Sequence, residues 1–84
     1  MEMHQYLVTL LYSKEKQQSV IISKTPKDAV LAMIKQVDVF VRKGYLICKI
    51  KACKWNNIDM ADVKVELINS TKKSVHYYRF DFDV

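Results

Sequence analysis

Apolar and polar residues alternate along most of this chain, and such alternation is the pattern of β-strands with one buried side. The alternating segments predict five strands, at residues 4–12, 18–23, 45–55, 63–69 and 74–84. The polar segments 13–17, 56–62 and 70–73 predict the loops and turns that separate strands. Most of the chain is therefore expected to form a sheet.

One segment repeats with the helical period instead. Thr25-Pro26-Lys27-Asp28 supplies a capping threonine, a proline suited to the first helical position and an acid in the first turn. Gly44 follows two cations and suits the left-handed position after a helix. The spacing predicts a helix over residues 26–43. The apolar stripe of this helix consists of Ala29, Val30, Met33, Ile34, Val37, Phe40 and Val41. Two further apolar residues, Leu31 and Val39, fall on the polar side, and the packing of one helix face does not explain them.

The predicted elements follow in the order ββαβββ, and their short connections favour antiparallel neighbours. We therefore expect an α+β fold with a single antiparallel sheet and one helix packed on one face. A chain of 84 residues has room for one modest core, so residues 1–84 are expected to form a single small domain.

The two faces of the predicted sheet differ in composition. One face carries apolar rows in the last three strands and is expected to meet the helix. The other face is mixed, with Tyr45, Trp55 and Tyr77 beside Lys49 and Lys51. Because one helix covers only one face, the second face is covered by a dimer partner, another macromolecule or the chain's own loops, or it is an ordinary half-solvated surface.

The first predicted strand is apolar on both of its sides. Leu7 and Leu11 lie opposite a row made of Tyr6, Val8, Leu10 and Tyr12. A strand that is apolar on both sides is usually covered on both sides. This strand therefore supports the expectation of a covered second face.

Positive charge concentrates in the third predicted strand. The chain has a formal net charge of +5, and residues 45–58 carry Lys49, Lys51 and Lys54 without an acidic residue. A basic stripe flanked by Tyr45 and Trp55 would attract an acidic protein surface or nucleic-acid phosphates, and its aromatics would stack on unpaired bases. Lysines on exposed strands also serve simply to keep the surface solvated.

Candidates for catalytic or metal-binding chemistry are few. Cys48 and Cys53 point to opposite faces of one predicted strand, so they neither hold one metal ion nor pair with each other. His4 and His76 have no cysteine or carboxylate at ligand spacing, and His76 is expected on the core face in a structural role. With one glycine the chain has no Gly-rich phosphate loop, and it has no G-x-S-x-G motif.

Asp81 and Asp83 share one face near the end of the chain. Paired carboxylates support acid–base or metal chemistry. These two are expected on an edge strand, where charge deters edge-to-edge aggregation. We therefore expect no enzymatic activity, no cofactor and no metal site.

The sequence does not suggest a membrane or secreted protein. Its apolar runs are far shorter than the ~20 residues of a transmembrane helix. Met1-Glu2-Met3-His4 lacks the basic and apolar regions of a signal peptide. Two cysteines do not form the framework of a disulfide-rich secreted domain. A cytoplasmic location is therefore expected.

These features favour a non-catalytic protein-binding module, such as a small inhibitor or adaptor from a phage or mobile element. That origin fits the compact, motif-free chain and its bias toward Lys, Ile and Asn, which is typical of an AT-rich genome. The expected partner-binding residues are rigid aromatics and long cations, namely Tyr45, Lys49, Lys51, Trp55 and Tyr77.

The expected partner is a macromolecule, with a protein preferred over a nucleic acid. Homodimerisation through the fifth strand or through the same face belongs to this hypothesis. The alternative is a nucleic-acid-binding protein that uses the basic stripe of the third strand.

Overall fold

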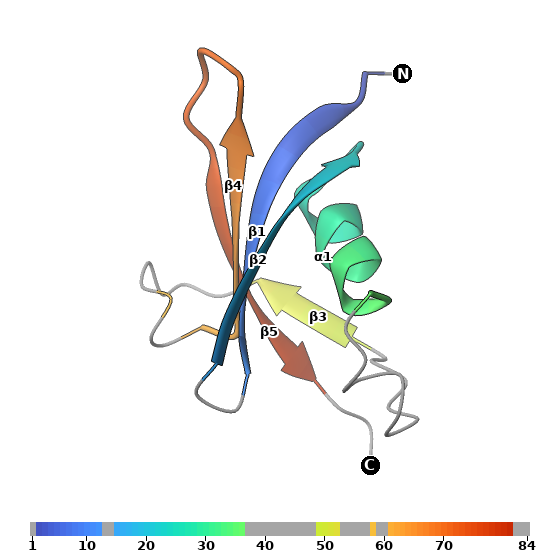
Figure 1. Ribbon diagram of the computed structural model, residues 1–84, viewed down its shortest axis with the longest axis vertical. Helices are drawn as coiled ribbons and strands as arrows, with labels where there is room; N and C mark the ends of the chain where they lie inside the picture. The colour runs from blue at the N-terminus through green and yellow to red at the C-terminus, as the bar shows by residue number, and fades with distance from the viewer. Residues whose placement is uncertain (1, 13–14, 37–48, 53–57, 59–60, 82–84) are drawn as a thin grey trace.

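The computed structural model describes residues 2–12, 15–36, 49–52, 58 and 61–81, and it confirms the expected α+β architecture. One antiparallel sheet carries a helix on one of its faces (Figure 1). The elements follow in the order ββαβββ and are β1 (His4–Tyr12), β2 (Glu15–Ser23), α1 (Pro26–Ile34), β3 (Lys49–Ala52), β4 (Val63–Ile68) and β5 (Val75–Asp81).

The strands lie side by side in the order β2-β1-β4-β5-β3, and each neighbouring pair is antiparallel. β1 and β4 form the centre of the sheet, with Val8 opposite Val65. β5 lies between β4 and β3, so the prediction of an edge position for the last strand is wrong over residues 75–81. The prediction is wrong because β3 does not pair with β4, the next strand in the sequence. It pairs with β5 instead, with Lys49 opposite Asp81. The outermost strands are β2 and β3.

The start of α1 follows the predicted capping chemistry. Thr25 has extended backbone angles, and its Oγ1 accepts a hydrogen bond of 3.1 Å from the Asp28 amide. Pro26 occupies the first turn, where its missing N–H costs no helical hydrogen bond. These contacts fix the point at which the chain leaves β2 and turns onto the sheet.

The end of α1 differs from the prediction, because the helix stops at Ile34 and not at residue 43. Lys35 is the C-cap, and its amide donates to the Leu31 carbonyl at 3.3 Å. The sequence after Gln36 is VDVFV, and its β-branched valines lower helix propensity. The rest of the predicted stripe and Gly44 lie outside the described residues.

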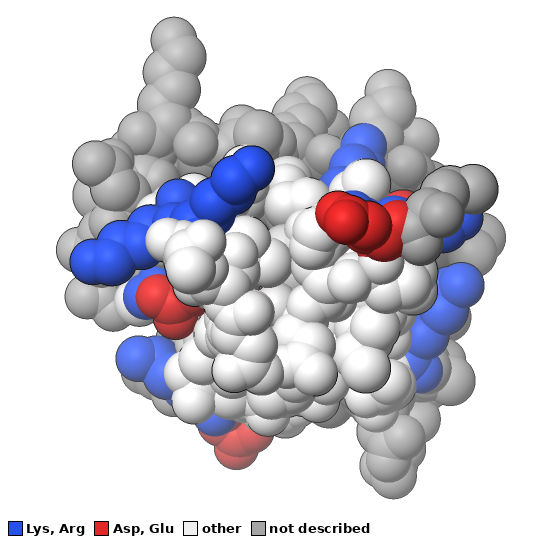
Figure 2. Space-filling view, turned by 90° about the horizontal axis from the view of Figure 1, so that it is seen from above, with Lys and Arg blue, Asp and Glu red and all other residues white. Residues whose placement is uncertain are grey.

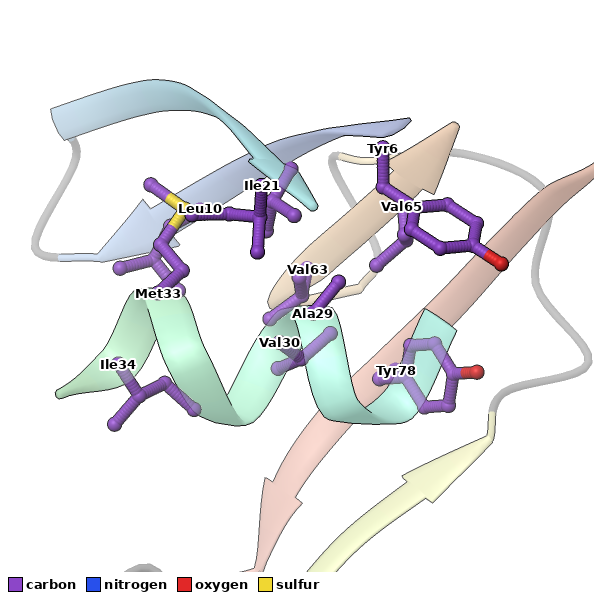
Figure 3. Packing of buried hydrophobic residues seen from close by; sticks show 11 residues of the cluster. Tyr6, Leu10, Ile21, Ala29, Val30, Met33, Ile34, Val63, Val65 and Tyr78 are labelled. Atoms are coloured by element: carbon purple, nitrogen blue, oxygen red, sulfur yellow. The ribbon is translucent and has the colours of Figure 1, made fainter. Parts of the chain in front are cut away.

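The core lies between α1 and the face of β2, β1 and β4 on which the helix packs. Val8, Val63 and Val65 are completely buried at its centre. Figure 3 shows the helical side chains pointing toward those of the strands. The cluster consists of Tyr6, Val8, Leu10, Ile21, Ala29, Val30, Met33, Ile34, Val63, Val65 and Tyr78.

Two strand assignments also change in detail. β2 begins at Glu15 and not at residue 18, because Lys16 pairs with Leu11 and extends the ladder. Glu15, Lys16 and Gln17, which suggested a loop, therefore lie on an outer strand and are exposed. His76 shares the helix side of the sheet with Val65, as expected, but it is exposed and not part of the core.

Candidate interaction surface

The side of the sheet opposite α1, here called the outer face, holds the residues that alternate with the core positions. The register of the strands arranges them in rows across the sheet. One row contains Val20, Leu7, Glu66 and Val75, and the next row toward the start of β1 contains Ile22, Gln5 and Ile68. Directly opposite residues have Cβ atoms about 4.5–5.5 Å apart, so side chains within each row contact one another.

Five apolar residues of these two rows form the outer apolar cluster, which consists of Leu7, Val20, Ile22, Ile68 and Val75. Leu7 lies at its centre, opposite Val20 and diagonal to Ile22 and Ile68. Val20, Ile22 and Val75 are 54%, 60% and 42% exposed. Apolar side chains of β2, β1 and β4 are therefore neighbours on this face, and Glu66 lies between Leu7 and Val75.

Charged side chains border this end of the molecule. Figure 2 looks onto the end at which β2 and β4 finish and β5 and α1 begin. Its central area contains no Lys, Arg, Asp or Glu, and charged residues of both signs lie at the margin.

A hollow of about 430 Å³ adjoins the outer apolar cluster at the turn between β4 and β5. Ile68 and Val75 line one part of it, and Lys72 and Lys73 line another. The turn is fixed locally, since the Lys72 amide donates to Ser70 Oγ at 3.2 Å. The lining thus combines apolar side chains with two cations, the carboxylate of Glu66 and two serines.

Asn69 begins this turn and connects it to β1. Its φ of 55° is in the left-handed region, which asparagine tolerates better than most residues. Its side-chain amide donates a hydrogen bond to Gln5 Oε1. The Leu67 amide donates to the Ser74 carbonyl at 2.9 Å and closes the hairpin. The hollow is therefore held by β1 as well as by its own strands.

A polar row separates the outer apolar cluster from the rest of the outer face. Gln18, Thr9, Lys64 and Tyr77 occupy it in order. Gln18 Nε2 donates to Thr9 Oγ1 at 3.0 Å, and Thr9 is buried. Tyr77 is half-buried opposite Lys64. This row marks the boundary between an apolar and a charged half of the face.

The charged half lies on β5 and β3. The Arg79 guanidinium lies 3.6 Å from the Asp62 carboxylate, before the start of β4. The register places Lys51 opposite Arg79 and Lys49 opposite Asp81. The basic positions predicted in the third strand therefore share the outer face with Tyr77.

Three of the five predicted binding residues lie in the described part of the chain. Tyr45 and Trp55 lie outside the described residues, as does Val39. Lys49 and Lys51 are strand positions on the same face as Tyr77, so three of the five are placed on one surface. Leu31, unexplained in the sequence, is 36% exposed on α1.

Sequence reasoning missed the contribution of β2 to this surface. Val20 and Ile22 flank the buried Ile21, so alternation within the run Val20-Ile21-Ile22 was the available signal. A continuous apolar run does not reveal which of its sides is exposed. Pairing with β1 supplies that information, because Ile21 lies opposite the buried Tyr6.

The described residues offer little for catalysis. Ser74 Oγ and His76 Nε2 are 2.8 Å apart, but both lie at the surface of the β4–β5 hairpin. The other described neighbour of the imidazole is Tyr78, whose ring stacks on it with centroids 6.3 Å apart. A serine nucleophile needs a base that a third group orients, and no carboxylate among the described residues does so here.

Tyr78 is the described residue with a perturbed acidity. Burial raises the pKa of its hydroxyl above the ordinary value of 10.0, and the neighbouring Tyr6 hydroxyl raises this pKa further. Both hydroxyls point out of the core on the same side (Figure 3). A hydroxyl with a raised pKa stays neutral at physiological pH, so Tyr78 contributes a neutral side chain to the core cluster.

Two further searches of the described residues gave negative results. No group of three or more His, Cys, Asp or Glu side chains there is placed to hold a metal ion. In the same part of the chain, no helix has the length and apolar character that crossing a membrane requires.

Comparison of the chain with known protein families, with curated proteins and with solved structures found no match.

Proposed function

We propose that this chain is a non-catalytic protein-binding module whose outer face docks a protein with an apolar surface bordered by acidic side chains. The observation that carries the proposal is the outer apolar cluster. Single exposed apolar residues are common on proteins, but adjacent ones from neighbouring strands mark interaction sites. Val20 and Ile22 of β2 are exposed beside the half-buried Leu7 of β1. Val75 of β5 is exposed on the far side of Glu66 and diagonal to Ile68.

Positive charge on this chain is the reason to propose that acidic side chains border the apolar surface of the partner. Lys72 and Lys73 line the hollow beside Ile68 and Val75, and these two cations outnumber the one carboxylate of the lining, Glu66. The whole chain carries a formal net charge of +5. Positive rim residues accelerate encounter with an acidic surface and align it, while the apolar contacts supply affinity. An apolar side chain of the partner would enter the hollow with a carboxylate close to the two lysines.

The proposal also specifies the kind of binding module, which is a small inhibitor or adaptor. A small inhibitor or adaptor, as expected of a phage or mobile element, acts by occupying the surface of another protein and needs no catalytic group. A compact sheet with one fixed apolar surface suits that task, because a preorganised surface loses little conformational entropy on binding.

A nucleic-acid-binding function is the second candidate. Lys64 lies opposite Tyr77, and Lys51 lies opposite Arg79 on the same face. Cations beside an aromatic ring suit a single strand of nucleic acid. The apolar half of the outer face has no role in this alternative, which is why the protein partner is preferred.

The proposal is tested by affinity purification of the tagged protein from its native host with matched variants. Val75→Lys alters the outer apolar cluster, and the double variant Lys72→Glu/Lys73→Glu reverses the rim charge. Leu31→Lys changes an exposed apolar residue of α1 and serves as the control. We expect a stoichiometric protein that the wild type and Leu31→Lys recover and that both other variants lose. Equal recovery by all variants, or no stoichiometric protein, would contradict the proposal.

Binding assays with single- and double-stranded DNA and RNA separate the two candidates. The nucleic-acid function requires affinity that falls steeply with salt concentration, and it requires a larger loss for Lys64→Ala than for Lys27→Ala on α1. Weak binding that both variants reduce equally reflects only the net positive charge. That result would eliminate the second candidate.

A further inference from the structure

β2 is the outermost strand of the sheet at the end where α1 packs. It pairs with β1 along all nine of its residues, from Glu15 opposite Tyr12 to Ser23 opposite His4. The sheet order places no strand on its other side. The backbone N–H and C=O groups along that side are therefore available to another strand, among the residues that the structure describes.

The charged residues of β2, Glu15 and Lys16, lie at its start, and the rest of the strand lacks the devices that protect an edge strand. Residues 17–23 read QQSVIIS and contain no charge, proline or glycine. Proteins commonly prevent edge pairing with lysines, prolines, bulges or very short strands. At the opposite end of the sheet, β3 carries Lys49 and Lys51. The two ends of the sheet therefore differ, and β2 is the one suited to pairing.

Exposed apolar side chains lie on the same strand. Val20 and Ile22 are the most exposed large apolar residues of the sheet. Both point to the outer face, while Ile21 between them is buried beneath α1. A strand added along β2 would satisfy its backbone groups and cover the flanks of Val20 and Ile22 in one step.

We propose that the occupant of this edge is β2 of a second copy, paired antiparallel about Ile21. In this register Val20 lies opposite Ile22 of the other copy, and Ile21 lies opposite its own counterpart. Ser19 then lies opposite Ser23, so the paired stretch 19–23 carries no charge and no two like charges face each other across the new pair. A self-complementary strand paired about its own centre gives an isologous two-fold dimer.

This dimer joins the two sheets into one continuous sheet and places both α1 helices on the same side. The two outer apolar clusters become neighbours across the two-fold axis. Because each cluster includes Val20 and Ile22, the dimer forms a wider apolar surface than one copy has. The inference goes beyond the proposed function, since dimerisation through the edge does not require the docked protein.

Interface size and charge determine how the dimer behaves. One strand pair is small beside the roughly 1,200–2,000 Å² that specific stable interfaces bury, so the dimer dissociates on dilution. Each copy carries a net charge of +5, so the two copies repel each other at low salt. Added salt screens that repulsion and should strengthen a neutral β2–β2 pair.

Sedimentation equilibrium over about 10 µM to 1 mM protein tests the dimer, a range suited to weak association. We expect the mass to rise from 9.9 kDa toward twice that value, and to rise at lower concentration when salt is added. The double variant Val20→Lys/Ile22→Lys is expected to remain a monomer. Val75→Lys, which alters the outer apolar cluster on β5, is expected to dimerise like the wild type.

Each other result overturns the proposal. A wild type that stays monomeric shows that β2 does not pair with itself. Loss of the dimer in Val75→Lys points to association through the outer face and not the edge. A dimer that persists in a folded Val20→Lys/Ile22→Lys variant places the interface elsewhere. Because Val75→Lys should abolish partner capture but retain the dimer, the two proposals fail separately.

A cross-linking experiment replaces the double variant if circular dichroism shows that it is unfolded. Val20→Cys and Ile22→Cys chains are mixed and oxidised, each carrying Cys48→Ser and Cys53→Ser. The proposed register requires that the mixture cross-links faster than either variant alone. Equal or absent cross-linking overturns the register and with it the proposal.

Discussion

Leu7 of β1 lies directly opposite Val20 of β2 on the outer face, while Tyr6 and Val8 on either side of Leu7 are buried beneath α1. β1 is thus apolar on both sides, but only one side is covered by the helix. Leu7 is half-buried, and its neighbours across the strands are Val20 and Glu66.

Alanine substitutions of two leucines on opposite faces of β1 compare how much the covered and the uncovered face contribute to stability. Leu10 is fully buried, so Leu10→Ala is expected to lower the free energy of unfolding by about 2–5 kcal/mol. Leu7→Ala removes the same atoms from a half-solvated site and should cost less than about 2 kcal/mol. Urea unfolding of both variants checks this. Equal losses would mean that the outer face is as well covered as the core.

The cap of α1 should contribute to stability through one hydroxyl. Thr25→Ala removes the acceptor for the Asp28 amide and is expected to cost about 1 kcal/mol. Thr25→Ser keeps the hydroxyl and should retain most of that stability. Thermal unfolding of the two variants provides the comparison. If Thr25→Ser loses as much as Thr25→Ala, the contribution comes from the methyl group and not from the cap.

The hydrogen bond between Gln18 and Thr9 should show as coupling between the two positions. Thr9 is buried, so its hydroxyl depends on the Gln18 amide as a donor. A double-mutant cycle with Gln18→Ala and Thr9→Val is expected to give a coupling of about 0.5–1.5 kcal/mol. Additive effects within experimental error would show that water replaces the glutamine.

Stability should fall at alkaline pH because of Tyr78. The folded protein favours its neutral hydroxyl, since burial raises the pKa above 10.0, whereas the unfolded chain ionises at the ordinary value. The folded state therefore holds more protons than the unfolded state above about pH 10, and stability declines as the pH rises there. Below that pH, Tyr78 adds no pH dependence.

The comparison variant for this effect is Tyr78→Phe. Urea unfolding from about pH 8 to pH 11 should show a smaller alkaline loss for Tyr78→Phe than for the wild type. Tyr77→Phe, on the opposite face of β5, keeps Tyr78 and should follow the wild type. If all three proteins lose stability in parallel, other groups cause the decline.

The alternation of apolar residues was sufficient to predict the five strands, because burial on one face selects every second residue. Thr25, Pro26 and Asp28 located the start of the helix, since capping is a local interaction. Its end was misplaced because a helical stripe and a β-branched run both contain regularly spaced valines. The strand order escaped prediction, since no local pattern indicates that β3 pairs with β5.

The candidate site was predicted only in part for a similar reason. Tyr77, Lys49 and Lys51 were assigned to one face by alternation within their own strands. The outer apolar cluster depends on pairing between strands that are distant in sequence, such as Glu66 with Leu7 and Val75. None of its residues indicates a site by its local sequence, and only the register brings them together.

The pairing of β1 with β4 also affects how the protein is made. It joins residues 5–10 to residues 63–68, so the middle of the sheet closes only after most of the chain has left the ribosome. Until then, the β1–β2 hairpin exposes a second open edge and both of its apolar sides. Long-range pairing of this kind slows folding and prolongs the exposure of aggregation-prone strands. Expression at lower temperature or with chaperones should therefore increase the soluble yield.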